Sequence, residues 1–347
     1  MPADSPRQAT IFDVARLAGV SHQTVSRVLN DLPNVRPSTK VRVQDAIKKL
    51  RYVPSPAARA LVTRRSRTIG VVATGGTEFG PSSTVLYFNA AARDARWSVF
   101  TANMVDGDPG SVRTAVEAFL RQSVEGIAVI SAHEGVTDIV AGMELTVPLV
   151  VLQATELAGI VTVGTDQYQG ARAAVRHLIG LGHHEIAHLA GPRDAVDARE
   201  RERGWRDELA DNGLSARVIG TGDWTPAAGF AFGSAFPAHE VTAVFAANDQ
   251  MALGLTHALT ERGLRVPEDV SIVGFDDIPE AAHFSPPLTT VRQDFRQLGT
   301  DLLVTLLARI NGEQPAPVHQ AVPQLVVRSS AVAPVALTTA HPTDTHG

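Results

Sequence analysis

The sequence predicts a mixed α/β protein, with a small helical unit at its N-terminus followed by two lobes built on parallel sheets. Three observations lead to this fold class. Residues 1–67 are basic and contain three short helical patterns. From residue 68 onward, short apolar runs alternate with amphipathic segments, which is typical of parallel sheets covered by helices on both faces. This alternation continues to about residue 330, which is long for one hydrophobic core and favours two lobes.

The composition of the 347-residue chain, 44% hydrophobic and 19% charged, is typical of a soluble globular protein. The chain contains no cysteine, which excludes disulfides, thiolate metal sites and a cysteine nucleophile. The first residues, MPADSPRQATIFDVA, include no apolar leader, and no apolar run approaches the ~18 residues that span a bilayer. We therefore expect a cytoplasmic protein that makes no membrane contact.

The net charge of −5 conceals a strong asymmetry along the chain. Residues 1–67 carry 13 Lys and Arg against four Asp, hence a charge of +9. The remaining residues carry 18 basic and 32 acidic side chains, hence −14. A basic N-terminal unit on an acidic body indicates a small module that binds a polyanion. The alternative from charge alone is a basic arm that is simply solvated.

The first two helical patterns lie within ATIFDVARLAGVSHQTVSRVLN. Thr10 and Asp13 have the spacing of a capping box that opens the first helix. Gly19 is expected to end this helix, and Ser21 to cap the next one after a short turn. The helical period places three residues on the inner face of the first helix: Val14, Leu17 and Ala18.

The second helix is expected to have an entirely polar outer face. Its inner face has three apolar residues: Val25, Val28 and Leu29. The outer face has five polar ones: His22, Gln23, Ser26, Arg27 and Asn30. Gln pairs well with adenine and Arg with guanine, and Gln23 and Arg27 are one turn apart, so this face suits the reading of base edges. A third helix is expected at about 38–51. The alternative is a three-helix bundle with an ordinary solvated face.

The segment IFDVARLAGVSHQTVSRVLN resembles the DNA-binding headpiece of the lac repressor (LacI/GalR) family of transcriptional regulators. The resemblance implies that His22, Gln23 and Arg27 read bases. It implies that a further set mostly contacts phosphates or caps helices: Ser21, Thr24, Ser26, Asn30 and Thr39. The family's type member has Tyr where this chain has His22, which leaves the preferred operator open.

The segment YVPSPAARALVTRRSRTIG connects the basic unit to the body. AARAL is a good helix former, but a helix of two turns is marginal without a partner. By the family resemblance it is a hinge helix that folds on DNA, with Leu61 as an apolar wedge in the minor groove. The alternative is a plain linker. We therefore expect a headpiece at 1–53, a hinge at 54–67, a core at 68–335 and a disordered tail at 336–347.

In the body, polar residues follow several of the expected strands. Gln153 follows PLVVL, Asn248 follows AVFAA, and Asp276 ends SIVGFD. Ligands of parallel sheets bind beyond the carboxyl ends of the strands, where amides and carboxylates can bond to hydroxyls. Trp224, in the loop GDW, can stack on sugar C–H groups. Each residue alone could be an ordinary turn residue.

Five segments resemble the core of the same family: DARERERGW, GDWTPAAGF, AANDQMALG, RVPEDVSIVGFDD and PPLTTVRQDFRQLG. The similarity runs from about residue 10 to about 330. It implies a two-lobed, periplasmic-binding-protein-like core, with the chain crossing between lobes near 164, 290 and 322. The implied ligand-binding residues are Gln153, Arg201, Trp224, Asn248, Asp276, Gln293 and Phe295.

The resemblance also assigns roles within this pocket. Arg201 bridges sugar hydroxyls, Asp276 and Asn248 accept and donate hydrogen bonds, and Trp224 and Phe295 supply apolar walls. The chain departs from the family's type member at Gln153, where that protein has Asp, so the preferred sugar can differ. The tail ALTTAHPTDTHG has no leucine heptads, so we expect a homodimer instead of a tetramer.

The expected function is that of a sequence-specific transcriptional repressor. Two headpieces hold a pseudo-palindromic DNA operator, and a small, galactoside-like sugar bound between the lobes releases it. We expect no cofactor. One alternative is a corepressor-dependent regulator of the same family, such as its purine-responsive members. Another is a plain sugar-binding protein, which the expected DNA-reading helix disfavours.

One motif points elsewhere, because His184–His188 matches the zinc-protease pattern H-E-x-x-H. That site requires a helix, but Gly182 is expected to end the preceding helix and EIAHLAG has the pattern of a strand. On a strand the two histidines lie roughly 13 Å apart, too far for one zinc ion. We therefore expect no metal site. With neither G-x-x-x-x-G-K-[ST] nor G-x-S-x-G present, we expect no enzyme activity.

Overall fold

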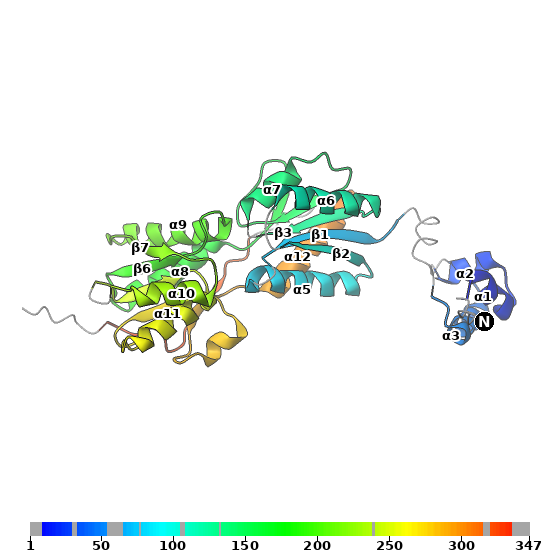
Figure 1. The fold of residues 1–347 in the computed structure, drawn as a ribbon. Helices are drawn as coiled ribbons and strands as arrows, with labels where there is room; N and C mark the ends of the chain where they lie inside the picture. Colours follow the sequence, from blue (N-terminus) through cyan, green and yellow to red (C-terminus); the bar gives the residue numbers. More distant parts are fainter. Residues whose placement is uncertain are drawn as a thin grey trace, which may run out of the picture. The chain divides into compact units, whose positions relative to one another are not determined.

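A computed structural model describes residues 9–29, 33–53, 65–75, 78–104, 108–131, 133–237, 240–314 and 320–334. The chain divides into two compact units, Met1–Arg67 and Thr68–Gly347, each of which is described by itself (Figure 1). Asn30, Leu61 and the expected tail at 336–347 lie outside the described residues, as does most of the expected hinge.

The first unit contains three helices, α1 (Ile11–Ala18), α2 (His22–Leu29) and α3 (Pro37–Leu50). The capping box is confirmed: the Asp13 amide donates to Thr10 Oγ1 at 3.4 Å, and the Thr10 amide donates to Asp13 Oδ2 at 2.9 Å. Gly19 ends α1 with a left-handed φ of 64°, which glycine adopts at little cost. The sequence therefore encodes both ends of α1.

The helices enclose a small core of seven buried residues: Val14, Ala15, Ala18, Val25, Val28, Val43 and Ala46. The expectation that Leu17 points inward is wrong, because it is 51% exposed. At 100° per residue, the buried arc of α1 is centred between Val14 and Ala15, and Leu17 lies roughly 110° from that centre. Leu29, expected inside, is partly buried against this core.

The N-lobe of the second unit is a five-stranded sheet in the order β2-β1-β3-β4-β5, with each strand parallel to its neighbour. Its strands are β1 (Thr68–Thr74), β2 (Ser98–Met104), β3 (Gly126–Ile130), β4 (Leu149–Leu152) and β5 (Val161–Val163). Figure 1 shows helices on both faces of this sheet. These are α5 (Phe79–Asp94) and α12 (Phe295–Ile310) on one face, and α6 (Pro109–Arg121) and α7 (Glu134–Ala141) on the other.

The C-lobe is a six-stranded sheet in the order β11-β10-β9-β8-β6-β7, parallel except for the β10–β11 pair. Its strands are β6 (Ile186–Ala190), β7 (Arg217–Thr221), β8 (Ala243–Ala246), β9 (Ser271–Asp276), β10 (Thr289–Arg292) and β11 (Gln324–Val326). Its helices are α8 (Gln167–Gly180), α9 (Val196–Asp211), α10 (Pro226–Ser234), α11 (Asp249–Glu261) and the short η1 (Pro279–His283).

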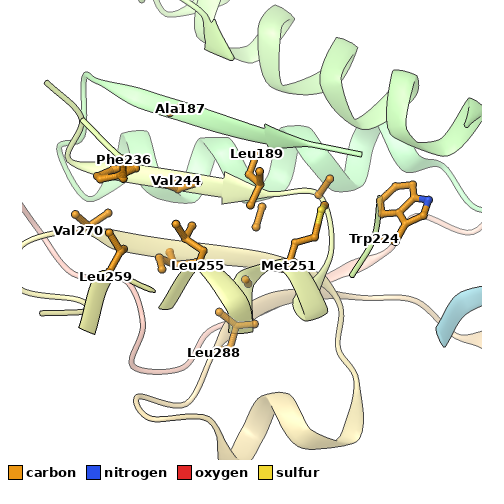
Figure 2. Close-up of a cluster of buried hydrophobic side chains, with 14 of the residues drawn as sticks. Ala187, Leu189, Trp224, Phe236, Val244, Met251, Leu255, Leu259, Val270 and Leu288 are labelled. Atoms are coloured by element: carbon orange, nitrogen blue, oxygen red, sulfur yellow. The ribbon is translucent and has the colours of Figure 1, made fainter. Parts of the chain in front are cut away.

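Each sheet has a hydrophobic cluster on both faces. Figure 2 shows the cluster between the C-lobe sheet and α11, where Leu189 and Val244 face Met251 and Leu255. Trp224 lies at the edge of this cluster. Burial of apolar surface on both faces explains why the central strands are apolar along their whole length.

The chain passes between the lobes three times: between β5 and α8, between β10 and α12, and between α12 and β11. The helix α12 therefore packs on the N-lobe although it follows five C-lobe strands in sequence. These crossings connect the two lobes at the edges where their strands end, which is where the strand-end side chains gather.

The H-E-x-x-H segment runs into a strand: His188 lies within β6, whereas His184 and Glu185 directly precede it. Its imidazole is fully buried, between the Trp205 ring at 5.3 Å and the Phe245 ring at 4.9 Å, and its Nδ1 is 2.8 Å from the Phe245 carbonyl oxygen. Burial lowers the pKa of His188 to about 4, so the ring is neutral at physiological pH. His188 is therefore a residue of the core.

Glycines allow α10 and α11 to pack closely, which generates a stability prediction. A Cβ added at Gly254 would lie 1.8 Å from the Pro226 carbonyl oxygen, whereas one added at Gly180, on α8, would meet nothing within 4 Å. We expect Gly254→Ala to lower the free energy of unfolding by about 1–3 kcal/mol or more, because the helices must separate. Gly180→Ala, the matched control, should be neutral or slightly stabilising. Denaturant titration measures both, and equal stability of the two variants would contradict the packing described.

Candidate functional site

The exposed face of α2 contains most of the residues expected to contact DNA. Ser21 caps the helix, since its Oγ accepts from the Thr24 amide at 3.2 Å and lies 3.0 Å from Thr24 Oγ1. His22 and Gln23 follow in the first turn, and both are exposed. The local sequence thus leaves two polar side chains free to approach a ligand at the N-terminal end of α2.

Arg27 lies one turn beyond Gln23 on the same face and is exposed. Its Nη2 donates to the Pro33 carbonyl oxygen at 3.0 Å. Ser26 is partly buried, and Thr39, also partly buried, lies in the first turn of α3. The structure therefore brings Gln23 and Arg27 onto one surface.

Phe12 belongs to the same surface, although the sequence reasoning did not single it out. Its side chain is 60% exposed, and its ring centroid lies 5.2 Å from that of His22. An apolar residue off the buried arc of α1 is the one sequence signal that could have identified it. An aromatic ring beside the polar face adds an apolar surface suited to a thymine methyl group or a sugar edge.

The second candidate site is a cavity between the N-lobe and the C-lobe, with about 810 Å³ of empty space including the part open to solvent. All seven residues expected to bind a ligand line it: Gln153, Arg201, Trp224, Asn248, Asp276, Gln293 and Phe295. Most of them follow the carboxyl end of a strand, as Gln153 follows β4 and Gln293 follows β10. Arg201 comes instead from α9, and Phe295 begins α12.

Arg201 is the centre of a buried hydrogen-bond network at this cavity. Its Nε donates to Gln167 Oε1 at 2.9 Å, and its Nη1 donates to the Ala247 carbonyl oxygen at 2.5 Å. Its Nη2 lies 3.6 Å from Asp276 Oδ1, and its guanidinium carbon lies 3.9 Å from the centre of the Phe275 ring. These partners stabilise a charge that is only 4% exposed.

Gln293 extends the network in both directions. Its Nε2 donates to Asp276 Oδ1 at 2.8 Å, and its Oε1 accepts from Gln167 Nε2 at 2.9 Å. The amide orientations are therefore set by the charged partners. Arg201, Gln167, Gln293 and Asp276 form one connected row along the C-lobe side of the cavity.

Asn248 has a structural task that the sequence did not predict. Its Oδ1 accepts from the Met251 amide at 2.8 Å and caps α11, and its Nδ2 donates to the Trp224 carbonyl oxygen at 3.0 Å. Trp224 has a left-handed φ of 71°, which L-residues seldom adopt without support. Asn248 therefore holds the Trp224 loop against α11.

The apolar walls of the cavity come from both lobes. Trp224 is 7% exposed, and its Nε1 has no hydrogen-bond partner within the described part of the chain. Phe295 packs edge-on against Phe79, with ring centroids 5.5 Å apart. Phe79 also contacts the hydrophobic cluster of the C-lobe, so it bridges the two lobes.

Asp276 is a buried carboxylate with an unusual affinity for protons. Burial is the largest effect and raises the pKa of Asp276. Arg201 and the hydrogen bond from Gln293 lower this pKa, and Asp197 raises it. The resulting pKa is about 6. Burial and the nearby Asp276 also raise the pKa of Asp249 well above its ordinary value. Asp249 accepts from the Ile278 amide at 2.9 Å and from Thr290 Oγ1 at 2.5 Å, so it positions the loop that follows Asp276.

The sequence reasoning missed several polar residues that line the cavity: Glu78, Ser131, His133, Gln167 and Asp197. Ser131 and Gln167 lie just beyond the ends of β3 and β5, so the strand-end argument could have found them. Glu78 and Asp197 lie near helix starts and had no such signal. His133 Nδ1 lies 3.0 Å from Asp194 Oδ2, a contact between the lobes.

Comparisons with known proteins agree with this architecture. Residues 10–55 match the family described as bacterial regulatory proteins, lacI family, and residues 175–331 match the periplasmic binding protein-like domain. The lactose operon repressor of Escherichia coli (strain K12) is 36% identical over 332 residues, which are 94% of this chain and 92% of that protein. The chain belongs to the LacI family. This repressor is therefore a DNA-binding transcriptional regulator, not an enzyme.

Other members of the LacI family are similar over comparable lengths. The transcriptional regulator CelR of Thermobifida fusca is 36% identical, covering 93% of this chain and 98% of that protein. The repressor PurR of Haemophilus influenzae (strain PittEE) is 34% identical with the same coverage of 93% and 98%.

Solved structures of the family have the same fold. The lac repressor dimer bound to operator and the anti-inducer ONPF superposes with a TM-score of 0.84 at 35% identity, covering 94% of this chain and 100% of that one. A CelR–cellobiose complex superposes with a TM-score of 0.67 at 32% identity, covering 93% and 99%. Within the described residues, no helix is long and apolar enough to cross a membrane.

The raised pKa of Asp276 generates a pH-dependent stability prediction. Because the folded state binds this proton more tightly than the unfolded chain, with pKa values of about 6 and 3.8, the group destabilises the fold as pH rises through that window. Asp276→Asn should therefore raise the free energy of unfolding by at most about 3 kcal/mol near pH 7.5, and by little near pH 4. Urea denaturation at both pH values measures the effect.

Asp269 is a control, because its substitution by Asn is expected to change stability in the opposite direction. It is exposed, and its hydrogen bonds from Arg265 lower its pKa to about 2, so Asp269→Asn should lower stability at neutral pH. A loss of stability in Asp276→Asn that did not vary with pH would contradict the described role of burial.

Proposed function

We propose that this repressor is released from its operator by a small, galactoside-like sugar that binds in the cavity between the lobes. The observation that carries the proposal is the row of Arg201, Gln293 and Asp276 beside the Trp224 ring. Charged and amide groups placed next to an aromatic face suit the hydroxyls and C–H faces of a sugar. No cofactor or metal is required by this function.

We further propose that the protein acts as a cytoplasmic homodimer on a pseudo-palindromic operator. Two copies of α2 would read two half-sites, with His22, Gln23 and Arg27 at base edges. Ser21, Thr24, Ser26 and Thr39 would contact phosphates or hold the helices in register. Asn30 and Leu61 keep the roles that the family resemblance implies, a phosphate contact and a minor-groove wedge.

Release requires that the sugar binds more tightly to the state that has left DNA. The coupling free energy typical of such systems is roughly 1–3 kcal/mol. The cavity supports this coupling because residues of both lobes line it, so a bound sugar changes the relative stability of lobe arrangements. The charge of +9 over residues 1–67 predicts that operator affinity falls steeply with salt.

The second candidate is a corepressor-dependent regulator, favoured by the 34% identity to PurR. It would have the same architecture, but its ligand would strengthen DNA binding. One titration separates the two: fluorescence anisotropy on family-type palindromes, with panels of sugars and purine bases. Sugar-driven release supports the proposal, purine-driven tightening supports the second candidate, and no salt-sensitive specific binding would exclude both.

Arg27→Ala tests the DNA-reading surface. We expect it to abolish specific operator binding and leave sugar binding intact, because α2 and the cavity lie in separate compact units. Anisotropy and calorimetry measure the two affinities. Arg121→Ala is the control, since this arginine is 67% exposed on α6 in the other unit and should change neither affinity. Loss of sugar binding in Arg27→Ala would contradict the assignment of separate roles.

Arg201→Ala tests the effector cavity. We expect operator binding to remain and release by sugar to fail, because the side chain that bridges the sugar hydroxyls is removed. Arg203→Ala is the matched control, because its side chain is 49% exposed on the same helix and pairs with Glu200. Ordinary sugar-driven release from Arg201→Ala would show that the cavity is not the effector site.

A further inference from the structure

We propose that Glu78 selects the effector by accepting a hydrogen bond from a second sugar ring, so that the preferred effector is a neutral disaccharide. This inference rests on the proposed sugar-binding function and concerns the N-lobe side of the same cavity. Neither the strand-end argument nor the family resemblance pointed to this residue.

The position of Glu78 leaves its carboxylate available to a ligand. The residue directly precedes α5, and its amide donates to the Gly75 carbonyl oxygen at 2.8 Å. Its side chain is partly buried and lines the cavity, yet it does not cap α5. Within the described residues, no group donates a hydrogen bond to this carboxylate. A partly buried carboxylate without donors is costly, and a ligand hydroxyl would supply one.

The charges around Glu78 favour neutral ligands that donate hydrogen bonds. Burial raises the pKa of Glu78, His133 lowers it, and the C-lobe carboxylates Asp276, Asp194 and Asp197 raise it. Carboxylates from both lobes therefore face the same space. The Arg201 guanidinium is already held within the C-lobe by protein partners. A carboxylate or phosphate on the effector would meet this negative field, whereas a sugar hydroxyl would donate to it.

A second observation points independently to a ligand in this cavity. Trp224 is more than nine-tenths buried, and its Nε1 has no partner within the described residues. Figure 2 shows the indole nitrogen on the edge of the ring turned away from the hydrophobic cluster. This donor requires an acceptor, such as a hydroxyl oxygen.

These two requirements lie on opposite lobes of the cavity. Glu78 needs a donor on the N-lobe side, and Trp224 needs an acceptor on the C-lobe side. Hydroxyls on two linked rings satisfy both, and residues of both lobes line the cavity that the rings would occupy. A single ring with an apolar substituent would leave the carboxylate of Glu78 without a partner.

Calorimetry on the full-length protein tests the inference with matched probes. The disaccharides are lactose and cellobiose, and the single-ring probes are methyl β-galactoside and methyl β-glucoside. We expect Glu78→Ala to weaken the disaccharide that binds wild type by about tenfold or more, the loss of one hydrogen bond to a charged group. The matching methyl glycoside should change by less than about twofold, because it does not reach Glu78.

Glu78→Gln separates charge from hydrogen bonding. The amide retains a hydrogen-bond acceptor. The Glu78→Gln variant should therefore lose less affinity for the disaccharide than the Glu78→Ala variant does. Its affinity for lactobionate and cellobionate, which are acidic, should rise relative to the neutral disaccharides because one negative charge is gone. Glu117→Gln, at an exposed position on α6 away from the cavity, should change none of these ratios.

The outcomes distinguish this inference from the function on which it rests. Equal loss of disaccharide and methyl glycoside binding would mean that Glu78 only supports the fold, and unchanged binding would mean that it contacts no effector. Tighter binding of the methyl glycoside by wild type would also overturn the inference. If wild type bound none of the sugars, the proposed sugar function would fail first. Denaturant titration, with midpoints of both Glu78 variants equal to that of wild type, verifies that the core folds.

Discussion

The hydrogen-bond network of the buried Arg201 guanidinium is the interaction on which the proposed effector site depends. It extends from α9 and binds Gln167, at the start of α8, together with the carbonyl of Ala247 and the carboxylate of Asp276. Gln167 follows the first crossing between lobes, and Gln293 lies at the second. The network therefore joins the cavity wall directly to two of the segments that connect the lobes. A ligand that moves Arg201 or Asp276 would therefore act directly, through these hydrogen bonds, on the segments that connect the lobes.

This arrangement has a cost in stability. Asp249 and Asp276 are carboxylates with raised pKa values, and the backbone at Trp224 and Asp276 is left-handed. Buried charges of this kind are held by partners and are rarely favoured over apolar residues. Asp276 lines the cavity, and Asp249 positions the loop that follows it. The hydrophobic clusters on both faces of each sheet offset that cost.

The position of polar residues at strand ends predicted much of the lining of the cavity, because that position depends on topology alone. Once parallel strands are expected, their carboxyl ends must share an edge, and Gln153, Asn248 and Asp276 come together there. The argument failed for Glu78 and Asp197, which lie near helix starts, where polar residues are common for capping reasons alone. It did not predict the structural role of Asn248, which lines the cavity and also bonds to α11 and to the Trp224 loop.

The sequence by itself determined the local structure and the division of the chain. Capping residues, Gly19 and the period of the apolar residues decide where α1 and α2 begin and end, and the charge asymmetry separates the headpiece from the core. The pattern of EIAHLAG predicted a strand where a zinc site of the H-E-x-x-H type would require a helix, and β6 confirms the strand. Tertiary structure alone decided which helix face is buried at Leu17 and that Glu78 faces acids of the C-lobe. These depend on contacts between residues far apart in the chain, whose partners no local pattern specifies.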